Sequence, residues 1–324
     1  MLTTFSATMD DVTLTRFSPA AFVPGALPYH RLARSTDAYR WWRPLVVGIV
    51  GVVFYGIFIV GCVIAMLIAR VISPDIGTAL DAFTRGQAAL DLSNPAVFAF
   101  TLLSLIYLLP SLFIAQLLAG TKPVGLLSSV AGRVRWGLLL RCLGIAAMVF
   151  ALSQGVSSTI AAFSGDGIPA PLGISEAALP LALTLLLVPF QAAAEEYVFR
   201  GYLMQTIGGW LRHPLFAILL PVPLFVIAHG YDPLGQTSVA VFAIIAGWLT
   251  WRTGGLEAAI GLHIVNNVSV FGLGAFGLVD ANASSLGIID LIITIATTLV
   301  YATVVVWLFR RGRRAATRQP GMPG

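Results

Sequence analysis

Long apolar runs alternate with short polar stretches along most of the 324-residue chain. A helix that crosses a bilayer needs about 20 mainly apolar residues, so these runs predict an all-α, polytopic bundle of about eight transmembrane helices. The sixth and seventh runs are separated only by "WRTGGL", which predicts a short hairpin turn. The predicted spans cover residues 43–71, 95–118, 136–160, 178–206, 214–230, 237–251, 255–275 and 286–309.

The two ends of the chain differ from these runs. Residues 1–38 are rich in Pro, Ser and Thr and lack a basic segment followed by an apolar core, so they predict a flexible or surface-lying tail and no cleavable signal peptide. Residues 311–324 predict a second, basic tail. The bundle itself is expected over residues 39–310.

Composition agrees with a membrane protein. Hydrophobic residues make up 58% of the chain and charged residues only 10%, whereas soluble domains carry roughly a quarter charged residues. The mean hydropathy is +0.90. Cys62 and Cys142 both fall inside apolar runs, which predicts neither a disulfide nor a metal cluster. The chain is therefore expected to have the lipid bilayer as its surroundings.

The basic residues are distributed unevenly. The net charge is +5, and the Arg and Lys residues favour every second loop and both ends, which is typical of the positive-inside rule and not of a protein that binds nucleic acid. Arg85 goes against this pattern. The alternation predicts an even number of spans with both termini in the cytoplasm. The Ala-, Gly- and Arg-rich composition suggests a bacterial plasma membrane.

Three charged residues interrupt the fourth run, in the stretch "QAAAEEYVFRGY". Charge at this depth is costly, and it usually marks function. Glu196 and Arg200 are four residues apart, so on a helix they share a face and can pair. Glu195 points about 100° away and is left without a local counter-ion. A structural alternative is that all three form one network that locks helices together.

Two further runs carry imidazoles. "PLFVIAHGYDP" contains His229, and "HIVNN" places His263 and Asn267 on one helix face, with Asn266 as a possible substitute for Asn267. Each group alone has a structural explanation, such as a hydrogen bond between helices. Together with Glu195 they form a set that can hydrolyse a bond: a carboxylate to take a proton from water, and imidazole and amide N–H groups for an oxyanion. No Ser or Cys lies beside a base as a nucleophile.

These motifs resemble a known family. "EEYVFR" fits Glu-Glu-x-x-x-Arg, "FVIAH" (225–229) fits Phe-x-x-x-His and "HIVNN" (263–267) fits His-x-x-x-Asn. Their order and spacing resemble the CPBP family of intramembrane proteases, also called the ABI or type II CAAX prenyl endopeptidase family. The resemblance covers about residues 178–275.

The resemblance implies a glutamate-dependent intramembrane endopeptidase. Glu195 would activate water with help from His229, His263 and Asn267 would form the oxyanion hole, and Glu196 and Arg200 would organise the site. A carboxylate with two histidines can also bind zinc, but HExxH spacing is absent, so a site without a metal or other cofactor is favoured. The expected substrate is a membrane-associated peptide or protein, and nothing in the chain reads a prenyl group.

The predicted helices leave His229 in an awkward place. A continuous helix puts it about 25 Å from Arg212 and puts His263 about 12 Å from Gly255, at 1.5 Å per residue. The two rings would then lie at different depths. They can meet only if the fifth helix is strongly tilted, or if "GYLMQTIGGWLRHP" folds as a re-entrant or interfacial segment.

Two other functions fit the same residues. Buried Glu, His and Arg side chains also serve proton relays, so a proton-coupled transporter or channel is one alternative. The sequence shows no inverted repeat of interrupted helices, which many transporters have. The other alternative is a non-catalytic scaffold that keeps a protease-like cavity and binds membrane proteins.

Overall fold

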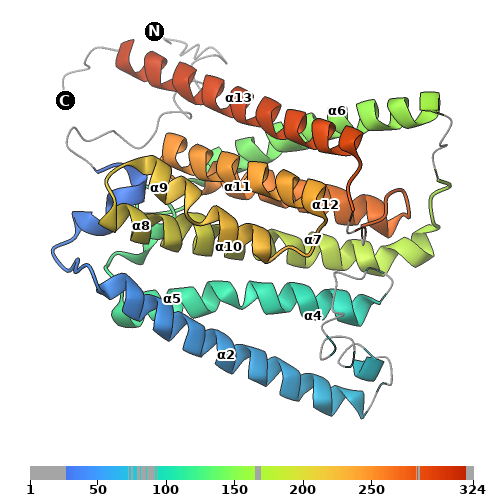
Figure 1. Cartoon of the computed structure of the whole chain (residues 1–324), viewed down its shortest axis with the longest axis horizontal. Helices are drawn as coiled ribbons and strands as arrows, with labels where there is room; N and C mark the ends of the chain where they lie inside the picture. Colours follow the sequence, from blue (N-terminus) through green and yellow to red (C-terminus); the bar gives the residue numbers. More distant parts are fainter. Residues whose placement is uncertain are drawn as a thin grey trace, which may run out of the picture.

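The computed structural model is a bundle of helices that run side by side (Figure 1). It describes residues 27–318 except 72, 74–75, 79–80, 82–84, 86–91, 93, 165–168, 282 and 284, and only the backbone of 312–318. Within these residues the β-structure is one isolated bridge, Ser129–Gly255. The predicted all-α bundle is thus confirmed. The parts of the two predicted tails at 1–26 and 319–324 lie outside the described residues.

Most of the predicted spans correspond to helices. They are α2 (Arg43–Arg70), α4 (Pro95–Ile106) continued by α5 (Leu108–Ala119), α6 (Trp136–Ser164), α7 (Ile174–Glu196), α11 (Pro233–Thr253), α12 (Glu257–Ala275) and α13 (Ile288–Arg318). Seven described segments are long and apolar enough to cross a membrane. The predicted hairpin turn is confirmed, because Gly254 takes a left-handed conformation with φ of 73° and ends α11.

The predicted span over 214–230 is present as a shorter apolar segment, Pro214–Ile227. It forms two short helices, α9 (Pro214–Leu219) and α10 (Val222–Ile227). Proline lacks the N–H that an internal helical position donates, and Pro221 lies at the break. Figure 1 shows α9 and α10 running only part-way along the bundle before α11 returns beside them. His229, just after α10, is half-buried.

The fourth span continues further than predicted. After α7 the backbone widens into a π-helix, η3 (Tyr197–Leu203), and then forms α8 (Met204–Trp210). The segment 201–214 is mainly helical as far as Trp210, so of the alternatives for this segment the re-entrant loop is not the one that forms. A π-helical turn is unusual and frequently accompanies a functional site. Here it carries Arg200.

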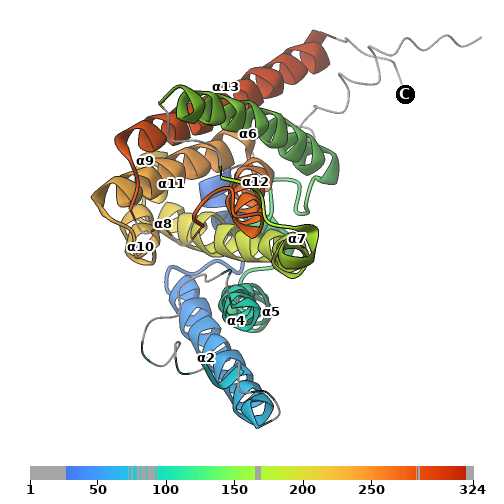
Figure 2. The same ribbon diagram turned by 90° about the vertical axis from the view of Figure 1, so that its right-hand side faces the viewer.

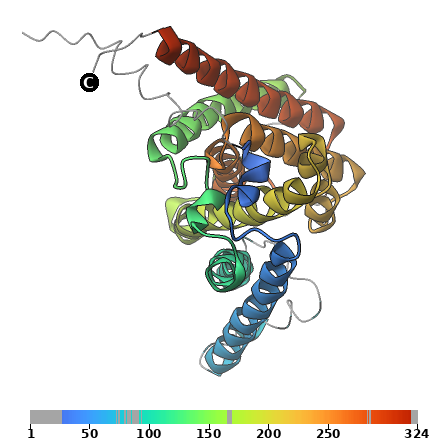
Figure 3. The ribbon, with the colours of Figure 1, turned by 90° about the vertical axis from the view of Figure 1, so that its left-hand side faces the viewer.

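The N-terminal segment packs against the bundle. A 3-10 helix, η1 (Tyr29–Ser35), buries Tyr29 and His30, and the Tyr29 hydroxyl donates to the carbonyl of Leu127. Figure 3 shows η1 at the centre of one end of the bundle. Burial lowers the pKa of His30, so protonation opposes this packing as the pH falls below the ordinary value for histidine. The predicted tail 1–38 therefore contains a packed element, and 311–318 continues α13.

Gly208 in α8 allows η1 to approach closely. A Cβ atom at this position would overlap the backbone carbonyl of His30, which cannot turn away as a flexible side chain could. Gly208→Ala is expected to lower the free energy of unfolding by about 1–3 kcal/mol, measured by thermal or denaturant unfolding in detergent. Gly144→Ala is the matched control, since a Cβ there meets nothing within 4 Å. Equal stability of the two variants would contradict this packing.

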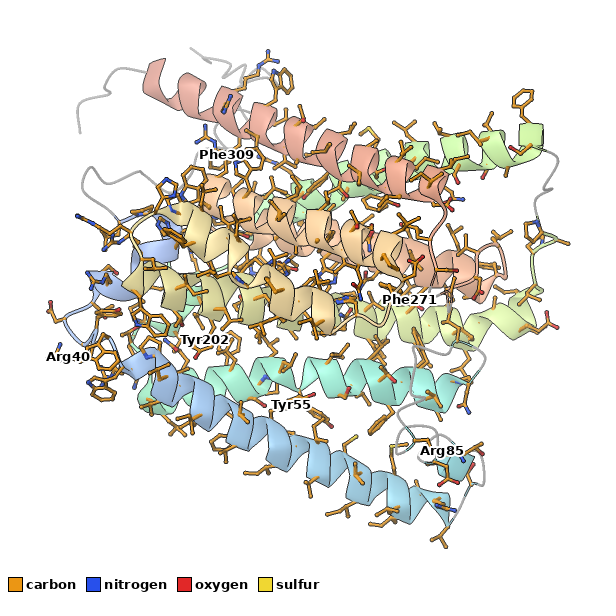
Figure 4. The ribbon with its side chains drawn as sticks, viewed as in Figure 1. Arg40, Tyr55, Arg85, Tyr202, Phe271 and Phe309 are labelled. Carbon is orange, nitrogen blue, oxygen red and sulfur yellow. The ribbon has the colours of Figure 1, made fainter. Side chains whose placement is uncertain are left out.

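The first span packs along α5 and leaves most of its remaining surface exposed. Figure 2 shows α2 leaning away from the bundle, and Figure 4 shows its side chains projecting outward along its length, with Tyr55 on the side toward α4 and α5. Only 6% of its most apolar stretch is buried, against 44% for α12. The core thus centres on α12, which packs mainly against α7 and α6. Helix α2 is left to face lipid.

A buried ion pair fixes the start of α12. Both oxygens of Glu257 accept from the Arg135 guanidinium, at 2.9 and 2.6 Å, and Arg135 also donates to the Thr253 carbonyl. Such a two-pronged pair is geometrically specific. It ties the beginning of α6 to the turn between α11 and α12 and so sets the position of α12 along the bundle.

Candidate active site

The Glu196–Arg200 pair forms as the spacing predicts. Arg200 Nη1 donates to Glu196 Oε1 at 2.8 Å, and the side chains are 4% and 0% exposed. Arg200 Nη2 donates to the carbonyl of Ala243 on α11 at 3.3 Å. The guanidinium also lies 4.3 Å from the centre of the Phe225 ring, a cation–π contact. This arginine therefore joins η3 to α10 and α11.

Glu196 has a second partner that its own helix could not supply. His263 Nδ1 on α12 lies 2.8 Å from the same oxygen, Oε1. A carboxylate oxygen accepts, so Nδ1 is the ring nitrogen that donates. The other nitrogen, Nε2, is left facing away from Glu196. One carboxylate thus orients both the guanidinium and the imidazole.

Glu195 is held at one oxygen only. Its Oε1 accepts from Gln191 Nε2 at 2.7 Å. Its Oε2 is buried, has no hydrogen-bond partner among the described residues, and lies 3.7 Å from His263 Nε2. The predicted lack of a local counter-ion is confirmed to this extent, and the imidazole it faces comes from another helix. The two atoms are too far apart for a direct hydrogen bond.

Asn267 joins this cluster through an amide that sequence reasoning missed. Asn267 Nδ2 donates to Gln191 Oε1 at 3.1 Å, and Asn267 Oδ1 accepts from Asn266 Nδ2 at 2.9 Å. Gln191 lies in the stretch "QAAAEEYVFRGY", four residues before Glu195. That spacing placed it on the same helix face as Glu195 and was the signal that could have identified it.

His229 lies in the loop after α10 and approaches the cluster through Phe225. Its Nδ1 lies 2.7 Å from the carbonyl of Phe225, so this nitrogen donates and Nε2 remains free of that bond. The Phe225 ring contacts both imidazoles, at 4.8 Å from the ring of His229 and 6.2 Å from that of His263. Phe225 thus links His229 to His263 through ring contacts.

Aromatic side chains and a small cavity surround the polar groups. The ring of Phe242 lies 5.1 Å from that of His263. A small pocket lies between η3, α9, α10 and α11, with Arg200, Phe225 and Phe199 in its lining. This shell lowers the local dielectric, which strengthens the electrostatic interactions of the site.

A metal ion would need several ligand side chains that point to one place. Over the described part of the chain, no three His, Cys, Asp or Glu side chains are arranged to hold one metal ion. His263 turns one nitrogen to each glutamate, with Nδ1 bonded to Glu196 and Nε2 toward Glu195. The expectation of a site without a metal stays a prediction.

The part of the chain that carries the site is similar to a known protein family. Residues 177–269 match the family model described as type II CAAX prenyl endopeptidase Rce1-like. This segment is similar to that family. It contains all six predicted site residues and Gln191, and the match supports a membrane CAAX-type protease fold for the protein.

One curated protein is also similar to part of the chain. The chain is 29% identical over 152 residues to "Uncharacterized protein YyaK" of Bacillus subtilis (strain 168), which covers 41% of this chain and 50% of the relative. The chain thus spans about half the length of that relative. No solved structure matches the chain.

Proposed function

We propose that the protein is an intramembrane endopeptidase that hydrolyses a peptide bond of a membrane-associated peptide or protein. One observation carries this proposal. A buried carboxylate oxygen, Glu195 Oε2, has no hydrogen-bond partner among the described residues and faces an imidazole nitrogen at 3.7 Å. The family match supports the reaction class.

The proposed step begins with water. Glu195 takes a proton from water while the water oxygen bonds to the carbonyl carbon of the substrate, which gives a tetrahedral intermediate with a negatively charged oxygen. Glu195 then passes that proton to the nitrogen of the leaving amine as the carbon–nitrogen bond breaks. The atoms balance without a covalent enzyme intermediate.

The spacing of the two facing atoms suits this intermediate. Its two oxygens lie side by side, so Glu195 Oε2 can contact the oxygen that came from water while His263 Nε2 contacts the former carbonyl oxygen. At 3.7 Å, the two protein atoms can bracket that pair. For this contact His263 carries hydrogens on both nitrogens. Two glutamates, Arg200 and His263 then sum to zero charge, which suits a buried site.

The remaining side chains complete the assignment. Asn267 Nδ2 uses one hydrogen for Gln191 and has a second one for the oxyanion. His229 Nε2, free of the Phe225 carbonyl, is assigned to hold the attacking water. Glu196 and Arg200 do not touch the substrate in this scheme, and they position His263 and close the site.

The cellular setting belongs to the same proposal. The described chain enters at η1 and leaves at the end of α13 on the same end of the bundle (Figure 1). With the basic residues concentrated there, we place both termini in the cytoplasm of a bacterial plasma membrane. Bacteria generally lack CAAX prenylation, so a small unprenylated membrane peptide is the proposed substrate class.

A comparison of peptides in membranes tests the proposal. Cells that express the wild type are compared with cells that express Glu195→Ala, by mass spectrometry of membrane and secreted peptides. At least one cleavage product should occur with the wild type and disappear with the variant, while its precursor accumulates. Matching peptide sets at equal expression of folded protein would contradict an endopeptidase of this kind.

A further inference from the structure

Gln191 lies between the two halves of the proposed site. It is on α7, one turn before Glu195, and only 4% of its surface is exposed. Its two polar atoms contact two different site residues, with Nε2 at 2.7 Å from Glu195 Oε1 and Oε1 at 3.1 Å from Asn267 Nδ2. Both polar atoms of a buried amide are thus used on the reacting groups.

The direction of each amide follows from the carboxylate. Glu195 Oε1 can only accept while it is ionised, so Gln191 must present its NH2 to Glu195 and its oxygen to Asn267. Asn267 must then present its own NH2 to Gln191, and its Oδ1 accepts from Asn266. Only one orientation of the Gln191 and Asn267 amides satisfies all three hydrogen bonds. The negative charge on Glu195 thus fixes the orientation of both amides.

We infer that Gln191 is a positioning residue for hydrolysis. It holds Glu195 by Oε1 so that Oε2 faces His263, and it turns the Asn267 amide so that N–H hydrogens face the site. The carboxylate of Glu195 on α7 and the amide of Asn267 on α12 are thereby held in fixed positions relative to each other. The catalytic role of Gln191 rests on the proposed function. The hydrogen bonds of Gln191 to Glu195 and Asn267 are observed independently of that function.

A purely structural role makes different predictions. Gln191 also joins α7 to α12, and such interhelical hydrogen bonds are worth about 0.6–2 kcal/mol in membranes. If joining helices were its whole role, its loss would lower stability and leave the titration of Glu195 unchanged. A positioning residue must also affect the protonation of the carboxylate that it contacts.

Infrared pH titration of the purified protein separates the two roles without a substrate. The band of the protonated Glu195 carboxyl is assigned by its loss in Glu195→Gln. Gln191→Met keeps the side-chain length but donates no hydrogen bond to the ionised carboxylate. The midpoint of this titration is expected to move upward by about one pH unit, a tenfold change in the protonation constant.

The matched control is Gln205→Met. Gln205 is equally buried, at 4% exposure, belongs to the same helical rod, and donates one hydrogen bond to the Leu126 carbonyl. Its variant should leave the Glu195 band unchanged. Should Gln191→Met fail to fold, Gln191→Glu preserves the shape. It places a second carboxyl beside Glu195, so the two should titrate in two separated steps.

The outcomes distinguish this inference from the proposed function. The role of Gln191 is overturned if the titration midpoint of the Glu195 band is the same in Gln191→Met as in the wild type, or if Gln191→Glu shows one unchanged titration step. This holds even if Glu195→Gln is inactive. A moved midpoint together with full peptidase activity of Glu195→Gln overturns the proposed function, and it leaves Gln191 as a residue that holds Glu195 without a role in hydrolysis. With an active enzyme, Gln191→Met should also lower kcat at least tenfold with little change in KM.

Discussion

Glu195→Gln should lose peptide hydrolysis almost completely. The change keeps the shape of the side chain and an oxygen that can accept from Gln191, but an amide cannot take a proton from water. General-base catalysis contributes about 10²–10⁴-fold, so kcat for the cleavage product found in membranes should fall by that factor. The measurement is the rate of product formation by purified enzyme in detergent or liposomes, with stability recorded in parallel.

The control for this prediction lies on the same helix. Glu176 is in the first turn of α7, is exposed, and accepts from the backbone N–H of Gly173. Glu176→Gln removes the same charge far from the cluster and should keep at least half of the wild-type rate. A Glu195→Gln enzyme that kept more than a tenth of the wild-type rate would rule out Glu195 as the base.

Arg200→Met should destabilise the protein strongly. Arg200 and Glu196 are both almost fully buried and lie 2.8 Å apart. Removing one partner of a buried pair leaves the other charge uncompensated, at a cost of about 3–5 kcal/mol. The substitution also removes the bond to the Ala243 carbonyl and the contact with Phe225. The loss is measured as a lower free energy of unfolding in detergent.

A double variant identifies the cause of that loss. Glu196→Gln combined with Arg200→Met removes the unpaired charge, and the double variant should regain part of the lost stability. It should not regain activity, because His263 Nδ1 would lose the carboxylate that orients it. If the double variant were as unstable as the sum of the two single variants, the ion pair would not be the source of the effect.

The local features of this site could be predicted because they depend on helical spacing. Glu196 and Arg200 pair at four residues, and Glu195 points elsewhere on the same helix, as the phase of any α-helix requires. Gln191 is four residues before Glu195 and so shares its helix face by the same spacing. It was missed because an uncharged amide costs less in an apolar run than a charged residue does. The hairpin turn at Gly254 was predictable for a similarly local reason.

The long-range parts of the site could not be predicted in this way. That His263 bonds to Glu196 and faces Glu195, and that Asn267 meets Gln191, depends on how α12 lies against α7. Helical phase gives the direction of a side chain around its own axis. It gives neither the rotation nor the sliding of one helix against another, which packing and the Arg135–Glu257 pair determine here.

The sequence by itself determined that this is an all-α membrane protein with a polar cluster on three apolar segments, since run length and residue spacing are local properties. The tertiary structure alone decided that the fifth run is two short helices around Pro221, and that His229 meets Phe225, whose ring also contacts His263. The reason is that an apolar run satisfies the bilayer whether its helix is continuous or broken, whereas its packing against α11 and η3 depends on contacts between segments far apart in the sequence.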